Sequence, residues 1–405
     1  SVTKDDEAVT LTIADGSEIV IPKYKGLTIT FDRQYRIPIK LNETQTIKYT
    51  ISGGGEKPII KVMVPDTWTA VVNKTDAASG EIAITCPKEN ASANEEVTVL
   101  VSDGKNAMVM RNLTFMVGDI SFIYYTTIDG KPVETPNIDS AKIGCNVYEA
   151  DENGEMRGIL ALNSGEIPGQ AFGNTLKTIT VKTSGNFVLQ ASAFAEQSHL
   201  TTFSADVIHW FDIYNKAFEK CSALEGVYIN SQGSNVSLQL FDYAFAGTAL
   251  TEFKITGYIF HMQLGNGIFA DCTNLKSFTF PDSVSDEGLY IYDRVFQNCT
   301  SLESITFPEG AMKFDKYDIF TGCSALKTVT FPSTTLCVEI RFSGCKNLSV
   351  IYIKVSDNIY WIALNKIQDH ADDLKIYVPT GKVDEYKQKG DCSNFKDRIV
   401  GYDFN

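Results

Sequence analysis

Hydrophobic and polar residues alternate in short stretches over the last two thirds of the chain, and these stretches recur in nearly the same sequence. GIFADCTNLKSFTFP at 267–281 returns as RVFQNCTSLESITFP at 294–308 and as DIFTGCSALKTVTFP at 318–332. Within each copy, a segment such as SITF at 304–307 alternates with a period of two and is rich in β-branched and aromatic types. This pattern predicts a short strand with one buried face, ended by the proline that follows.

A phenylalanine marks the register of the repeat, and it recurs eight times at intervals of 22 to 27 residues. These marker phenylalanines are Phe172, Phe194, Phe218, Phe245, Phe269, Phe296, Phe320 and Phe342. A leucine follows each of them within four to six residues. A second, weaker strand is predicted before the phenylalanine, as in VSLQLFDYAF at 236–245 and LYIYDRVF at 289–296.

The energetics of one unit explain why it is repeated. Each unit contributes about four large apolar side chains, worth roughly 1.5–3 kcal/mol each when fully buried. Ordering ~24 residues costs about 1.5 kcal/mol per residue. A single unit is therefore unstable alone, and the repeat predicts a solenoid in which each coil covers the apolar edge of its neighbour.

Cysteine shares the register of the repeat. Five of the nine cysteines lie three residues after a marker phenylalanine, and Thr248 takes that place in another copy. The five are Cys221, Cys272, Cys299, Cys323 and Cys345. The pattern predicts a column of buried thiols in the turn, with disulfides between adjacent coils as an alternative. A metal site is less favoured, because the chain has no CxxC and no Cys/His pair at ligand spacing.

The pattern Phe-x-x-Cys-[Ser/Thr]-x-Leu-x-x-[Ile/Val/Phe]-x-[Phe/Ile]-Pro resembles the BspA-type leucine-rich repeat of bacterial surface proteins. The segments at 122–134 and 374–404 are similar to those that open and close such arrays. The first two copies lack the cysteine, as is common for terminal repeats. The resemblance implies a mainly β protein with a leucine-rich-repeat solenoid of ~24-residue repeats and terminal caps over residues 120–405. It also implies adhesion to host matrix proteins, cells or other bacteria.

The first third of the chain alternates without the repeat. AVTLTIADGSEIVIP at 8–22 surrounds an Asp-Gly pair, which is a strong hairpin signal. Further strand-like runs follow at 47–55, 61–75, 80–90, 95–106 and 108–118. Their lengths and spacing predict an antiparallel β-sandwich of Ig-like type.

We therefore divide the chain into a β-hairpin segment over 1–30, an Ig-like β-sandwich over 31–119 and the solenoid over 120–405. The sandwich also resembles β-rich modules that precede repeat arrays in surface lipoproteins of Bacteroides-type bacteria, through segments such as DTWTAVV at 66–72. Trp68 is expected in the sandwich core, with an exposed binding tryptophan as the alternative.

Composition narrows the classes of partner. The formal net charge is −14, which argues against nucleic acid and anionic lipid, because both attract clusters of Lys and Arg. No apolar run reaches the ~20 residues that a membrane span needs. We expect an extracellular or outer-membrane-anchored protein whose signal segment has been removed.

No residue constellation points strongly to catalysis. Asp282, Asp286, Glu287 and Asp293 could supply the carboxylate pair of a glycoside hydrolase, but acidic loops on an acidic protein are usually solvated. His209 and His261 have no nucleophile motif beside them. We predict that the protein is not an enzyme and has no metal, cofactor or catalytic residue.

The residues of the repeat strand that face outward are mostly Ser and Thr, with aromatic residues toward the C-terminus. Such a face suits solvent, and it also suits a binding partner. A second aromatic set flanks the marker phenylalanines: Trp210, Tyr214, Tyr258, Tyr290, Tyr292 and Tyr317. The candidate partner-binding residues are Tyr228, Tyr290, Tyr292, Tyr352 and Tyr377. The predicted function is binding of a host or bacterial surface protein, and the alternative is glycan capture for nutrient uptake.

Overall fold

The computed structural model describes residues 2–4, 8–12, 18–22, 26–34, 37–53, 57–89, 91, 94–105, 107–118, 120–133, 136–151, 153–162, 165–281, 283–285, 288–310, 312–313, 318–337, 341–355, 357 and 367–404. The chain forms two compact units, Ser1–Asp119 and Ile120–Asn405. Both units consist mainly of β-strands, which confirms the predicted fold class.

A three-stranded antiparallel sheet begins the first unit. It contains β1 (Val2–Lys4), β2 (Ala8–Thr12) and β3 (Glu18–Pro22). Thr12 pairs with Glu18 across β2 and β3, in agreement with the hairpin signal of the sequence. The predicted turn residues Asp15 and Gly16 lie outside the described residues.

Two four-stranded sheets form the rest of this unit. One has the order β4 (Thr28–Phe31), β6 (Thr44–Ser52), β9 (Ser79–Thr85), β8 (Thr69–Lys74). The other has the order β5 (Ile37–Ile39), β11 (Met108–Val117), β10 (Asn94–Ser102), β7 (Ile59–Met63). Alternate residues of both sheets enter one core, as in a β-sandwich. Trp68 is buried there, 5.6 Å from the ring of Phe115, which confirms its predicted place.

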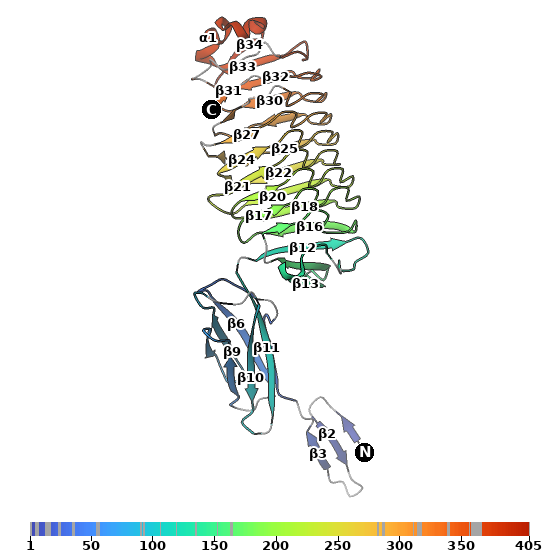
Figure 1. Ribbon diagram of the computed structural model, residues 1–405, viewed down its shortest axis with the longest axis vertical. Coiled ribbons are helices and arrows are strands. Elements are labelled where there is room, and N and C mark those ends of the chain that lie inside the picture. The colour runs from blue at the N-terminus through green and yellow to red at the C-terminus, as the bar shows by residue number, and fades with distance from the viewer. Residues whose placement is uncertain are drawn as a thin grey trace. The chain divides into compact units, whose positions relative to one another are not determined.

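The second unit is a solenoid of about nine turns over residues 166–402, in which two rows of strands stack coil upon coil (Figure 1). The front row contains β16 (Leu176–Lys182), β18 (Thr202–Val207), β20 (Gly226–Ser231), β22 (Glu252–Thr256), β25 (Ser277–Thr279), β28 (Ser304–Thr306), β30 (Thr328–Phe331), β32 (Val350–Ile353), β33 (Lys375–Pro379) and β34 (Ile399–Tyr402). The back row contains β15 (Glu166–Ile167), β17 (Phe187–Leu189), β19 (Phe211–Ile213), β21 (Ser237–Leu240), β24 (His261–Leu264), β27 (Leu289–Ile291), β29 (Met312–Lys313) and β31 (Thr335–Cys337). A further parallel pair joins β23 (Tyr258–Ile259) to β26 (Ser283–Val284).

The marker phenylalanines lie between the rows and are all buried. Rings of successive markers are 4.9 to 5.8 Å apart, and their planes differ by 3° to 21°. These separations are close to the spacing of neighbouring strands in a sheet. The predicted coil-on-coil stacking is confirmed.

Each turn around a marker phenylalanine contains left-handed backbone. Around Phe218, Lys216 has φ 60° and Lys220 has φ 58°. Around Phe296, Arg294 and Asn298 have φ 58° and 57°. Around Phe194, Phe218, Phe245, Phe269 and Phe296, left-handed residues lie both two positions before and two positions after the marker, where the chain passes from the back row to the front row.

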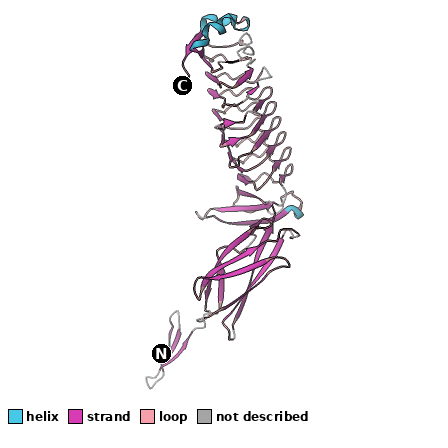
Figure 2. Ribbon diagram, turned by 90° about the vertical axis from the view of Figure 1, so that its left-hand side faces the viewer, coloured by secondary structure: helices cyan, strands magenta, loops and turns pink. Residues whose placement is uncertain are grey.

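Different structures close the two ends of the solenoid. At the start, three antiparallel strands extend the front row: β12 (Ser121–Thr127), which pairs with β16, then β14 (Met156–Leu162) and β13 (Ile143–Ala150). The short helix η1 (Ser140–Lys142) directly precedes β13. At the end, η3 (Thr380–Lys382), α1 (Val383–Gln388) and η4 (Gly390–Arg398) form the helical segment in Figure 2. Tyr386 of α1 is buried and donates a hydrogen bond to the carbonyl of Val355, 3.1 Å away.

Candidate functional site

Serine and threonine hydroxyls cover much of the outward face of the front row. Because side chains alternate along a strand, every second residue turns away from the phenylalanine core. Some hydroxyls bond between neighbouring strands: Thr126 and Thr178 are 2.7 Å apart, as are Thr180 and Ser204. Farther along, Thr279 and Thr306 are exposed. The face is thus polar and presents hydroxyl groups over many coils.

Tyr228 lies on this face in β20, and 37% of it is exposed. Its hydroxyl donates a hydrogen bond to the carboxylate of Glu252 on the next coil, and this bond raises the pKa of the Tyr228 phenol. The ring also lies against Gly226, where a Cβ atom would be 2.8 Å from the hydroxyl. Tyr228 is therefore held in a fixed position on the surface.

Tyr290 and Tyr292 belong to the back row and its turn, so they lie on a different face of the solenoid from Tyr228. Tyr290 is 43% exposed, and its ring centroid is 5.4 Å from that of His261. Tyr292 is also exposed. The five predicted binding residues thus do not form one site.

Tyr352 and Tyr377 are brought together at the C-terminal end of the front row. They are opposite one another in β32 and β33, with ring centroids 5.1 Å apart and planes 21° apart. Tyr402 of β34 joins them at 5.5 Å from Tyr352 and 5.6 Å from Tyr377. Phe404 completes the group, 4.9 Å from Tyr402. We call these four rings the C-terminal aromatic cluster.

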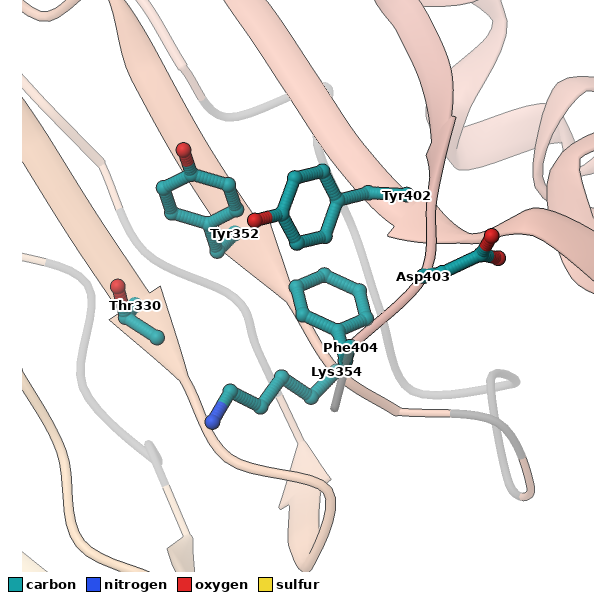
Figure 3. A pocket seen from close by; sticks show the side chains of 6 residues that line it. All are labelled: Thr330, Tyr352, Lys354, Tyr402, Asp403 and Phe404. Atoms are coloured by element: carbon teal, nitrogen blue, oxygen red, sulfur yellow. The ribbon is translucent and has the colours of Figure 1, made fainter.

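A hollow of about 310 Å³ opens beside this cluster (Figure 3). Tyr352, Tyr402 and Phe404 supply aromatic walls, and Thr330, Lys354 and Asp403 complete the lining, with the carboxylate of Asp403 turned away from the three rings. We call this hollow the C-terminal pocket. Lys354 Nζ is 4.0 Å from Glu309, and Asp403 accepts a hydrogen bond from the hydroxyl of Thr380. The pocket combines apolar ring faces with an ammonium and hydroxyl groups.

Sequence reasoning missed Tyr402, Phe404, Lys354 and Asp403. A usable signal exists for one of them, because Tyr352, Tyr377 and Tyr402 follow each other at intervals of 25 residues. That interval is close to the length of one coil, so the third tyrosine continues the column of the first two. Phe404 lies beyond the last strand, and no repeat pattern indicates where its ring packs.

The cysteine column is structural. Each column thiol donates to the carbonyl of the marker phenylalanine one coil earlier, as from Cys221 to Phe194 at 2.9 Å and from Cys323 to Phe296 at 3.0 Å. Burial raises the pKa of Cys221 to about 12 and that of Cys272 to about 11. All five column thiols are buried and free, so the disulfide alternative is wrong for them.

The remaining candidates divide between structural and undescribed residues. Asp282, Asp286, Glu287 and Tyr317 lie outside the described residues. Asp293 accepts a hydrogen bond from the backbone N–H of Asp318 at 3.3 Å, which links two coils. Trp210 and Tyr258 are exposed, whereas Tyr214 packs edge-on against Phe241 at 4.8 Å. Within the described part of the chain, no three His, Cys, Asp or Glu residues are grouped so that they could hold a metal ion.

A comparison with known protein families identifies the type of repeat. A family model for the BspA type leucine-rich repeat region matches the chain in six copies, over residues 158–265 and 239–370. These residues contain all eight marker phenylalanines. No curated protein matches the chain. Among the described residues, no helix is long and apolar enough to cross a membrane.

Proposed function

The chain belongs to the BspA-type leucine-rich repeat family, and from this we propose that it is a non-enzymatic binding protein at the cell surface. Proteins with this repeat are typically secreted or found at the surface. The partner we propose is a protein of a host or of another bacterium. Its binding site is the outward face of the front row, from Tyr228 to the C-terminal aromatic cluster.

The observation that carries this proposal is the exposed aromatic surface at the C-terminal end of the parallel strands of the front row. Solenoids bind partners through such extended faces, since every coil presents the same few positions. Tyrosine is enriched at protein interfaces because it combines a large apolar ring with a polar hydroxyl. Tyr228 and Tyr402 are 37% and 44% exposed, and Tyr352 and Tyr377 are partly exposed.

A non-enzymatic role agrees with how the chain uses its reactive groups. The column thiols are buried and their raised pKa disfavours the thiolate, the nucleophilic form. Described carboxylates such as Asp293 and Asp242 accept backbone hydrogen bonds from the next coil. These groups hold the coils together and are occupied by that task.

We propose further that the sandwich is an Ig-like module that carries the solenoid. Taken in chain order, β4 and β6 to β11 correspond to strands A to G, and β5 is a second segment of strand A. The two sheets then read A-B-E-D and C-F-G, which is the Ig arrangement. The parallel pairing of β5 with β11 adds that second segment beside strand G.

The function is tested by binding of the full chain to immobilised extracellular matrix proteins and to intact bacterial cells. Tyr228→Ala and Tyr377→Ala should each weaken binding to a protein partner by about tenfold, as expected for anchoring aromatic residues. Trp210→Ala, on the back-row side, is the matched control and should leave the affinity unchanged. If Tyr228→Ala and Tyr377→Ala bind with the affinity of the unaltered chain, the interface lies on another surface.

A further inference from the structure

We propose that the C-terminal pocket binds one neutral pyranose ring of a carbohydrate. This inference rests on the proposed function and names the ligand chemistry of one end of the binding face. A glycan attached to a partner protein and a free glycan offer the same ring.

The arrangement of the aromatic rings fits a flat ligand with an apolar face. Tyr402 and Phe404 stand at 62° and 82° to the ring of Tyr352, so the rings meet as walls of a corner. Figure 3 shows these three rings bordering the same space. A pyranose presents axial C–H groups on its face, and these pack against the electron-rich face of an aromatic ring. A corner of rings can therefore contact the face and one edge of the sugar.

The polar groups of the pocket fit the hydroxyls at the edge of a sugar. Thr330 supplies a hydroxyl and Lys354 an ammonium donor. Lys354 is 4.0 Å from Glu309, beyond hydrogen-bond distance, so that ion pair leaves its N–H donors available.

The balance of charge favours a neutral ligand. Lys354 would repel a cationic ligand, and the carboxylate of Glu309, 4.0 Å from Lys354, already offsets the charge that an anionic ligand would meet. An apolar peptide side chain would cover Lys354 without giving it a partner, which is costly. Sugar hydroxyls both donate and accept hydrogen bonds, and so they can pair with both Thr330 and Lys354.

Size and position indicate how a longer glycan would continue. A volume of about 310 Å³ is at the small end of ligand sites, which is enough for one ring. Thr306, Thr330, Tyr352 and Tyr377 are aligned across four successive coils. Sugar units beyond the first would follow this line toward the exposed hydroxyl of Thr306.

The test uses the full chain on a printed array of neutral, sialylated and sulfated glycans. Calorimetric titrations with maltotriose, cellotriose, mannotriose and chitotriose follow, beside each corresponding monosaccharide. We expect at least one neutral trisaccharide to bind, and more tightly than its monosaccharide.

Variants assign that binding to the pocket. Tyr402→Ala and Phe404→Ala should each reduce the affinity by about tenfold, because each removes one wall. Tyr402→Phe keeps the ring and should retain most of the affinity. Tyr290→Ala, an exposed tyrosine on the back row, is the matched control and should bind as the unaltered chain does. Melting curves show whether each variant is folded.

Three results would overturn the inference. The first is no glycan binding while a protein partner still binds with the same affinity after enzymatic deglycosylation, which leaves the proposed function intact. The second is glycan binding that the folded Tyr402→Ala and Phe404→Ala variants retain. The third is binding restricted to sulfated or sialylated glycans and lost only in Lys354→Met. Absence of both protein and glycan binding would overturn the proposed function as well.

Discussion

Each column thiol hydrogen bonds from its own coil to the coil before it, so the cysteine couples neighbouring repeats. Cys272 bonds to the carbonyl of Phe245 at 3.1 Å, and Cys299 bonds to that of Phe269 at 3.3 Å. Thr248, at the same position, bonds instead within its own coil to Phe245 and contacts the sulfur of Cys272 at 3.2 Å. The register predicted the burial of this column. It could not predict the partner, because the direction of a thiol or hydroxyl bond depends on the three-dimensional turn.

These thiols should be unreactive in the folded protein. A thiol-specific reagent such as DTNB at pH 8 should leave the five column cysteines unmodified, because they are buried and burial raises their pKa. The same reagent in denaturant should modify them all. Mass mapping of the labelled residues gives the measurement, and rapid labelling of Cys221 or Cys345 in native buffer would contradict it.

Asp212 should make the solenoid less stable as the pH rises. It lies between Val188 and Gln239 in the back row, and burial raises its pKa from 3.8 to about 6. The folded state therefore binds more protons than the unfolded state between these values, and stability is lost as the pH rises from about 4 to 6. Asp212→Asn removes this loss and should stabilise the protein by about 1–2 kcal/mol at pH 7.5.

Thermal unfolding at pH 4 and pH 7.5 measures the effect of Asp212. The variant and the unaltered chain should melt at similar temperatures at pH 4, where the aspartate is still protonated in the folded state and little of the stability has been lost. Asp206→Asn, a front-row aspartate that accepts a hydrogen bond from Asn230, is a suitable comparison. A variant that gains no stability at pH 7.5 would show that the buried carboxylate finds compensation in the fold.

At the scale of the element, the marker turn differs most from what the sequence indicates. Strand alternation, the phenylalanine register and both strand rows follow from the repeat, because each depends on where apolar side chains must be buried. The left-handed residues do not follow, since Lys216, Lys220 and Arg294 occupy positions that usually favour glycine. Packing of the whole coil overrides this local preference.

Replacement of Lys220 tests the cost of that override. Lys220 has φ 58° and is exposed, so Lys220→Gly relieves steric strain without loss of a buried side chain. We expect it to be neutral or to stabilise by up to ~1 kcal/mol. Lys220→Val should destabilise by about 1–2 kcal/mol, because a β-branched residue tolerates this backbone poorly. Chemical denaturation of both variants gives the comparison, and an equal effect of Gly and Val would show that backbone strain is not what matters there.

At the scale of the whole molecule, the sequence predicts the solenoid better than it predicts the surface. The eight marker phenylalanines define a core that can be aligned by eye, since equal register means equal depth. The C-terminal aromatic cluster depends on Phe404 and on the angle at which β34 ends, and neither follows a repeat. The repeat assigns Tyr290 to the strand before a marker phenylalanine and Tyr352 to the strand after one, but it does not indicate which rings from neighbouring coils meet.

Both ends of the solenoid need their closing segments. Deletion of residues 383–405 removes α1, η4 and β34 and uncovers the backbone edge of β33. Uncovered edges pair with other chains, so the shortened protein should form dimers or aggregates. Size-exclusion chromatography with light scattering measures this, and Tyr402→Ala, which keeps the closing segment, should behave as the full chain does. A monodisperse shortened protein of unchanged size would contradict the prediction.

Coil length varies from 22 to 27 residues while the phenylalanine rings keep their spacing, and this has an engineering consequence. The longer coils do not widen the ring spacing, so a coil could be duplicated or removed in the middle of the array without altering the last few coils. Each such change would move the C-terminal pocket by one strand spacing, about 4.8 Å, relative to the first coil. The distance of the pocket from the first coil could then be changed without changing the residues that line the pocket.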